Sequence, residues 1–150
     1  LRGTTIQLLS SLPQNASFIN IYKQGIDAPS YHVAGACLNA LLKLNDEETI
    51  QKIPSFEDAS NVNIISPLAQ YYTKTGEQKH YQWFEDKMKQ ASSQDLYDLM
   101  VIFTKYALQL SNEDKAKAIV FLKQISIENQ HEVIRKNAKT YAQYIEKSIK

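Results

Sequence analysis

Apolar residues recur at the spacing of an α-helix along the whole chain, and no segment shows a convincing strand pattern. The segment 27–44, DAPSYHVAGACLNALLKL, has the broadest apolar arc. Its main stripe has i, i+3, i+4 spacing, and it consists of Val33, Ala36, Cys37, Ala40, Leu41 and Leu44, widened by Tyr31, Ala34, Leu38 and Leu42. We therefore expect a helix that other helices cover on at least two sides.

Narrower apolar stripes predict further helices around 61–75, 77–90 and 93–110, one after Asn112 and a last one that continues to the C-terminal residues. Gly76 is placed to stop the first of these, and Pro67 suggests that this helix begins only at Ser66. Candidate N-caps of the predicted helices are Asp27 or Ser30, Asn45, Ser93 and Asn112.

Short connections between amphipathic helices predict antiparallel neighbours that pack in layers. Helix starts recur roughly every thirty residues, which is within the range of helical repeats, although the segments are not strictly alike. We expect an all-α fold of about eight helices in one domain over 1–150. It is predicted to be either a HEAT/armadillo-like α-solenoid or an irregular helical bundle.

Charge and composition exclude several classes of partner. With 17 basic and 16 acidic side chains the net charge is +1, so nothing favours nucleic acid or an anionic membrane. No run approaches the ~20 apolar residues of a membrane span, and no signal sequence opens the chain, so we expect a soluble protein of unassigned compartment. The only cysteine, Cys37, is expected in the core. The chain starts with Leu1 rather than Met, and we expect it to be part of a longer protein.

The segment 27–41 has the form D-x-x-S-Y-x-V-x-x-A-x-L-x-A-L. It resembles the signature helix of a HEAT-like repeat and, in this form, the C-terminal helical domain of aminopeptidase N-like zinc metallopeptidases. The segment 71–88, YYTKTGEQKHYQWFEDKM, is similar to the same domain, where a helix ends at Thr-Gly and an aromatic-rich helix follows. The segment 1–13 is consistent with the repeat before it. The resemblance implies a non-catalytic domain that packs on an N-terminal catalytic domain and shapes access for short peptide substrates.

The catalytic motifs of that family are missing from this chain. Those peptidases hold zinc on a His-Glu-x-x-His helix and bind the substrate's amino terminus with a Gly-x-Met-Glu-Asn segment. The nearest string here is HEVIR at 131–135, in which Arg135 stands in place of the second zinc ligand. His32 and His80 lie in other predicted helices without partners at metal spacing. We expect no catalytic, cofactor or metal site in this chain, and we expect zinc in the catalytic domain.

Two groups of residues are candidates for peptide or partner contact. The aromatic residues Tyr71, Tyr72, Tyr81 and Trp83 would suit a peptide-binding groove, although such residues more often pack between helices. The basic residues Arg135 and Lys139 would attract an acidic partner or a peptide carboxylate, or they form a solvated helix face. The alternative function is a free-standing α-solenoid scaffold that binds a protein partner. An enzyme with an unrecognised site is a third option.

Overall fold

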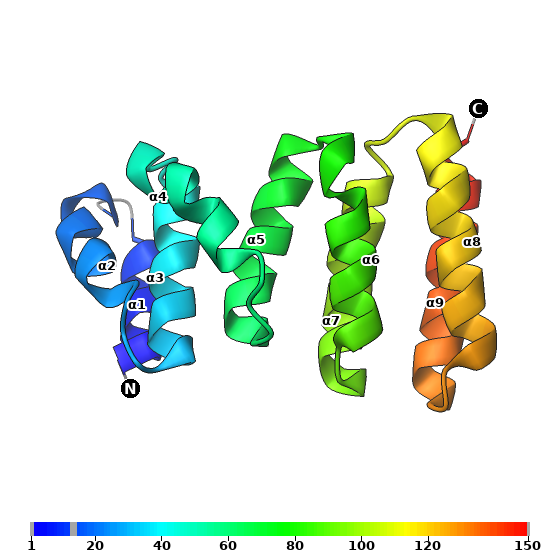
Figure 1. Ribbon diagram of the computed structural model, residues 1–150, viewed down its shortest axis with the longest axis horizontal. Helices are drawn as coiled ribbons and strands as arrows, with labels where there is room; N and C mark the ends of the chain where they lie inside the picture. The colour runs from blue at the N-terminus through cyan, green and yellow to red at the C-terminus, as the bar shows by residue number, and fades with distance from the viewer. Residues whose placement is uncertain (1, 13–14, 150) are drawn as a thin grey trace. The chain divides into compact units, whose positions relative to one another are not determined.

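A computed structural model describes residues 2–12 and 15–149, and within these ranges the chain is helical throughout (Figure 1). It contains nine α-helices, three short 3-10 helices and no strand over that part of the chain. The all-α prediction is confirmed, with one α-helix more than the approximate number expected. The chain divides into two compact units, 1–71 and 72–150. Whether the repeats are HEAT-like stays a prediction.

The helices of the first unit are arranged around α3 (Tyr31–Lys43). The helices α1 and α2 pack on α3, and α4 contacts it near its end. These neighbours bury eight residues of α3: Ala34, Gly35, Ala36, Cys37, Leu38, Ala40, Leu41 and Leu42. The prediction of a helix covered on at least two sides is therefore confirmed. The other helices that begin in this unit are α1 (Arg2–Ser10), α2 (Ile19–Gly25), α4 (Glu47–Lys52) and α5 (Val62–Thr75).

The close approach of α5 to α3 depends on one glycine and one proline. The helix α5 begins at Val62 and runs through Pro67, so the predicted start at Ser66 is wrong. Pro67 has no N–H to donate to the carbonyl of Asn63, four residues earlier. That carbonyl oxygen lies against Gly35 of α3, where a Cβ would be only 2.0 Å away. A residue without a side chain is therefore needed at this contact.

The observed N-caps lie one residue away from three of the predicted ones. Ser92 and Ser111 accept hydrogen bonds from the N–H groups of Asp95 and Asp114, in place of the expected Ser93 and Asn112. Asp46 caps α4 by accepting from Thr49 N–H. Asn45, the predicted cap, has a left-handed φ of 55° just after α3 instead. Ser30 is the N-cap residue of α3, as proposed, but its side chain makes no capping hydrogen bond.

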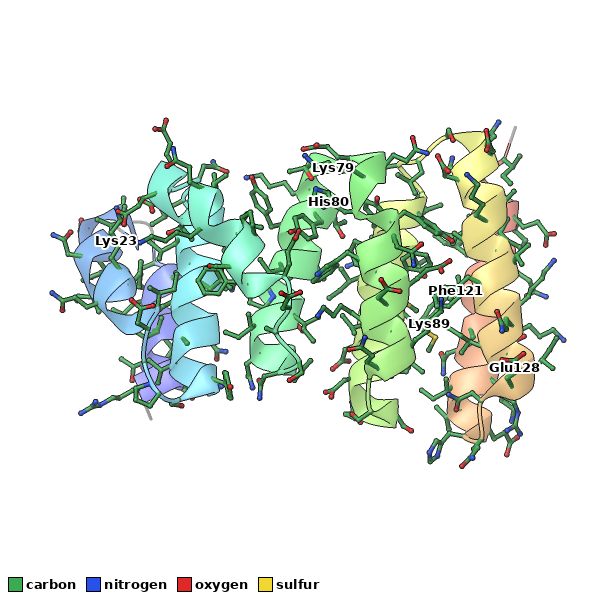
Figure 2. The ribbon with its side chains drawn as sticks, viewed as in Figure 1. Lys23, Lys79, His80, Lys89, Phe121 and Glu128 are labelled. Atoms are coloured by element: carbon green, nitrogen blue, oxygen red, sulfur yellow. The ribbon has the colours of Figure 1, made fainter. Side chains whose placement is uncertain are left out.

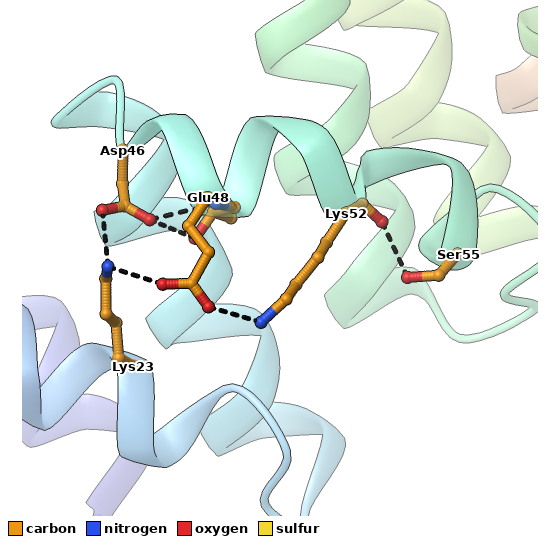
Figure 3. Close-up of polar contacts among 6 residues, drawn as sticks. Lys23, Asp46, Glu48, Lys52 and Ser55 are labelled. Carbon is orange, nitrogen blue, oxygen red and sulfur yellow. Dashed lines mark hydrogen bonds and ion pairs between the residues drawn. The ribbon is translucent and has the colours of Figure 1, made fainter.

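Lys23 joins α2 to α4 by pairing with two carboxylates (Figure 3). Its Nζ lies 3.0 Å from Oδ1 of Asp46 and 2.9 Å from Oε2 of Glu48. The other oxygen of Glu48 accepts from Lys52 at 2.7 Å. The first-turn acids that the sequence places beside the helix dipole therefore also form a small ion-pair network. Only the Asp46 end of this network is largely shielded from water, because the Asp46 side chain is 8% exposed.

The second unit contains the two helix pairs α6 with α7 and α8 with α9. The helix α8 packs mainly on α9, and α9 also packs on α7. In Figure 1, α6 and α8 lie nearer the viewer, and α7 and α9 lie behind them. None of the helices within 2–12 and 15–149 is both long and apolar enough to cross a membrane. The helices are α6 (Tyr81–Gln90), α7 (Ser93–Ala107), α8 (Asn112–Glu128) and α9 (Glu132–Glu146).

The core of the second unit contains a cluster of aromatic side chains. Phe84 stacks on Tyr106 with ring centroids 4.6 Å apart, and Phe103 lies 5.7 Å from Phe84. Phe121 of α8 meets Phe103 edge to face at 5.9 Å. The connection before this core turns at Gly76, whose φ is 65°, so the predicted helix stop at Gly76 is confirmed.

Candidate functional site

An open groove runs between α6 and α8 in the second unit, and we call it the α6–α8 groove. One part has a volume of about 760 Å³, and a second part has a volume of about 250 Å³. The two parts adjoin at Lys89, Phe121 and Gln124, which line both of them. The first part extends to Tyr81, Glu85, Glu113, Lys117 and Val120, and the second to Met88, Leu96, Ile125 and Glu128.

The floor of the groove is apolar, and so is part of its rim. Phe121, Met88 and Leu96 are buried beneath it, with exposed fractions of 6% or less. Val120, the residue next to Phe121, is 66% exposed, and Ile127 on the same face of α8 is 78% exposed. Apolar side chains in such a position leave contact surface for another molecule.

The two lysines of the groove are neutralised by acids on their own helices. Lys89 Nζ lies 3.2 Å from Oε2 of Glu85 and 5.6 Å from the ring centre of Phe121 (Figure 2). Lys117 pairs with Glu113 at 3.1 Å and with Asp114 at 2.9 Å. These pairs leave no uncompensated positive charge among the described lining residues.

The carboxylate of Glu128 has a different environment. Within residues 2–12 and 15–149, its two oxygens accept hydrogen bonds only from the neutral amide of Gln124, at 3.2 and 3.1 Å. No cation of the described ranges lies within ion-pair distance of it. Figure 2 shows Glu128 at one end of α8, with Lys89 and Phe121 further along the groove. The Glu128 end of the groove is therefore negatively charged.

Two tyrosines lie near the other end of the groove. Tyr106 donates its hydroxyl to the carbonyl of Glu77 at 2.7 Å, and burial, followed by the nearby Asp114, raises the pKa of Tyr106 to about 12. The Tyr81 hydroxyl is buried and has no hydrogen-bond partner in the described part of the chain. Burial and then the carboxylate of Glu85 raise the pKa of Tyr81. Both phenols stay protonated at neutral pH.

The aromatic residues predicted from the sequence do not form one exposed patch. Tyr72 is 1% exposed, stacks on His80 at 3.6 Å and meets Trp83 edge to face at 5.0 Å. Tyr81 and Trp83 are half-buried, and of these two only Tyr81 lines the groove. Tyr71 is half-buried and belongs to the first unit. Packing between helices therefore accounts for Tyr72.

The basic residues on α9 are not equivalent. Nη1 of Arg135 donates to the carbonyls of Asn129 and Gln130, at 2.9 and 3.0 Å, and so satisfies backbone acceptors at the end of α8. Lys139 is exposed on the surface of α9. Arg135 therefore binds the backbone of its own chain. Neither Arg135 nor Lys139 lines the α6–α8 groove.

The string 131–135 forms a helix start. His131 is the N-cap residue of α9, and Glu132 in its first turn pairs with Lys136 at 2.6 Å. Over residues 2–12 and 15–149, no three residues among His, Cys, Asp and Glu are grouped to hold a metal ion. Zinc therefore does not fit any set of side chains in the described ranges. Cys37 is a buried core residue, and burial raises the pKa of its thiol.

A smaller pocket of about 430 Å³ lies where α7 and α9 begin. It is lined by Ser93, Gln94 and Tyr97 from α7 and by residues 131–134 from α9. No described side chain that lines it is a buried polar group without a partner. It is the weaker candidate site of the two.

The sequence analysis did not single out the residues of α8 that line the groove. The signal was present, because Val120, which lines the groove, is apolar and lies off the stripe of Ala118, Phe121, Leu122 and Ile125, whose first three residues are buried. Apolar residues outside the core stripe of a helix indicate a second contact surface.

Comparisons of the chain with protein-family models, curated proteins and solved structures found no match.

Proposed function

We propose that this chain is a non-catalytic helical domain of an aminopeptidase N-like zinc metallopeptidase. In that protein it would pack on the catalytic domain, which would hold the zinc, and would shape the access of short peptides. The observation that supports this proposal is the conformation of the segment that carries the resemblance. Residues 31–43 form the central helix of their unit, and the small residues Ala34, Gly35 and Ala36 are buried where α3 meets its neighbours.

The second resembling segment also has the expected local structure. The helix α5 ends at Thr75, Gly76 has a left-handed φ of 65°, and the aromatic helix α6 follows. Phe84 and Met88 of that helix are buried in the core of the second unit. In the proposed enzyme, a domain with these features would pack on the catalytic domain.

The proposal is tested by isolating the protein with the polypeptide partners it has in cells. An antibody raised against the 150-residue chain is used for immunoprecipitation, and the captured protein is eluted with excess chain. The eluate is assayed with an aminoacyl p-nitroanilide. We expect hydrolysis that 1,10-phenanthroline removes and added zinc restores, because catalysis would depend on the zinc of the catalytic domain.

The control is a precipitation with pre-immune antibody, which should give no chelator-sensitive hydrolysis. Efficient capture of the antigen without aminopeptidase activity would contradict the proposal. Activity of the purified 150-residue chain alone would contradict it as well, since it would require a catalytic site of the chain's own.

A second candidate function is a helical scaffold that binds a protein partner without any peptidase. The α6–α8 groove favours it, because Val120 is 66% exposed beside an apolar floor. This candidate predicts that the precipitated antigen carries a partner protein and has no peptidase activity.

A further inference from the structure

We infer that the α6–α8 groove binds an amphipathic α-helix of a partner protein. The apolar side chains of that helix would contact Val120 and Phe121, and one of its basic side chains would lie beside Glu128. This inference rests on the partner-binding candidate and names the chemistry of the partner. It is independent of any peptidase activity, because it concerns a surface that the isolated chain presents by itself.

The secondary structure of the groove favours a helix over an extended peptide. Both walls, α6 and α8, are helices whose backbone N–H and C=O groups are bonded within the helix. An extended strand would find no backbone partners on these walls, unlike a strand that adds to the edge of a sheet. A helix satisfies its own backbone groups and needs only side-chain contacts.

The apolar contacts fix which face of the partner helix is bound. Phe121 and Met88 form a buried floor, and Val120 lines the groove and is exposed. Ile127 does not line the groove, but it is exposed seven residues further along α8. Seven residues are close to two helical turns, so these two side chains lie on one line along α8. A partner helix with apolar residues at i, i+3, i+4 and i+7 would cover this line.

The charges fix the chemistry of the partner. Three carboxylates and two lysines line the groove, and both lysines pair with acids of the chain itself. The remaining charge is that of Glu128, whose partner is the neutral Gln124. A lysine or arginine of the partner would find a carboxylate there, whereas an acidic residue would be repelled.

The test uses two synthetic helical peptides as probes for the full chain. Each has about sixteen residues, with leucines at i, i+3, i+4 and i+7. One carries lysines on its polar face and the other carries glutamates at the same positions. Binding of the fluorescein-labelled peptides is followed by fluorescence anisotropy. We expect the lysine peptide to bind at least about tenfold more tightly than the glutamate peptide, a difference that a single close charge pair can supply.

Two apolar residues of equal exposure provide a matched pair of variants. Val120 in the groove is 66% exposed, and Leu8 on α1 of the first unit is also 66% exposed. Val120→Arg should weaken binding of the lysine peptide at least about tenfold, and Leu8→Arg should change it less than about twofold. Circular dichroism checks that both variants keep their helices, and Val120→Ser gives a milder second test. Glu128→Lys should remove or reverse the preference for the lysine peptide.

Three outcomes would overturn the inference. They are failure of the lysine peptide to bind, equal binding of the two peptides, and equal effects of Val120→Arg and Leu8→Arg. None of these outcomes bears on whether the immunoprecipitated protein is an aminopeptidase, so the inference and the proposed function fail separately.

Discussion

The carboxylate of Asp46 has the most constrained environment of the acids around Lys23. It accepts from the Thr49 N–H at 3.0 Å, from the Thr49 hydroxyl at 2.8 Å, and it pairs with Lys23. Burial alone would raise the pKa of Asp46, but the hydrogen bonds from Thr49 and Lys23 outweigh that effect and hold the pKa below its ordinary value of 3.8.

Asp46→Asn should make the free energy of unfolding depend less on pH in the acid range. A carboxyl whose pKa is depressed by folding stabilises the fold above its unfolded-state pKa, and this stabilisation is lost as pH falls through the folded-state pKa. The free energy of unfolding of the unaltered chain should therefore fall between about pH 5 and about pH 2, and the variant should show a shallower fall. Asparagine is as good an N-cap as aspartate, so the cap itself is kept.

The measurement is a series of urea unfolding curves at several pH values. At neutral pH the variant should be less stable by about 1 kcal/mol, since the Lys23 side of the pair is partly exposed to water. The control is Glu47→Gln, which removes an exposed carboxylate of the same helical turn. Equal acid slopes for the unaltered chain and for Asp46→Asn would contradict this account of Asp46.

Two helix elements meet at close range where Gly35 of α3 lies against the Asn63 carbonyl of α5. Two effects of opposite sign act on a Gly35→Ala change. Alanine is favoured over glycine inside a helix by about 1 kcal/mol, but its Cβ would lie 2.0 Å from a backbone oxygen. Backbone cannot turn aside as a side chain can, so the clash should dominate.

Gly35→Ala should destabilise the chain by about 1–3 kcal/mol in chemical denaturation. Gly3→Ala is a matched control, because a Cβ there also comes within 2.0 Å of a neighbour, but that neighbour is the side chain of His32. His32 is exposed and can rotate away, so Gly3→Ala should be neutral or slightly stabilising. Equal effects of the two substitutions would show that the Asn63 carbonyl does not limit the approach of α5.

A double-mutant cycle measures whether Pro67 contributes to the contact between Gly35 and the Asn63 carbonyl. Pro67→Ala supplies the N–H that draws the Asn63 carbonyl back into the hydrogen bonding of α5. The cost of Gly35→Ala should then be smaller by at least about 0.5 kcal/mol in the Pro67→Ala background. Additive effects of the two changes would mean that Pro67 and Gly35 act independently.

The elements show what periodicity can predict and what it cannot. The apolar arc around Leu38 and Leu41 predicted the central position of α3, because a stripe that surrounds a helix must be covered. The position of caps was less well predicted, since Ser92 and Ser93 are chemically identical and only the backbone decides which one caps α7. Periodicity also did not predict that α5 continues through Pro67 or that the Asn63 carbonyl lies against Gly35, which is distant in sequence and on another helix.

The candidate site was harder to predict than the fold. The predicted aromatic contact residues include Tyr72, which packs on His80 inside the second unit. The groove depends on the spacing between α6 and α8, and a helical pattern carries no information on the distance between two helices. Only Tyr81 of the predicted contact residues lines it.

At the scale of the whole molecule, the described chain consists of two helical units, 1–71 and 72–150. The first has α3 at its centre, and the second has a core that includes Phe84, Phe103 and Tyr106. Among residues 2–12 and 15–149, no three side chains of His, Cys, Asp or Glu are grouped to hold a metal ion. We propose that the chain is a non-catalytic helical domain of an aminopeptidase N-like zinc metallopeptidase, and this is the central claim.

The most direct test of that claim is the size and sequence of the native polypeptide that contains these 150 residues. The antibody against the chain is used to purify it from expressing cells, and the product is analysed by electrophoresis and peptide mass spectrometry. We predict a polypeptide several times longer than the chain, with a His-Glu-x-x-His peptide in the same molecule. A native polypeptide of about the chain's own length, without such a peptide, would contradict the aminopeptidase proposal.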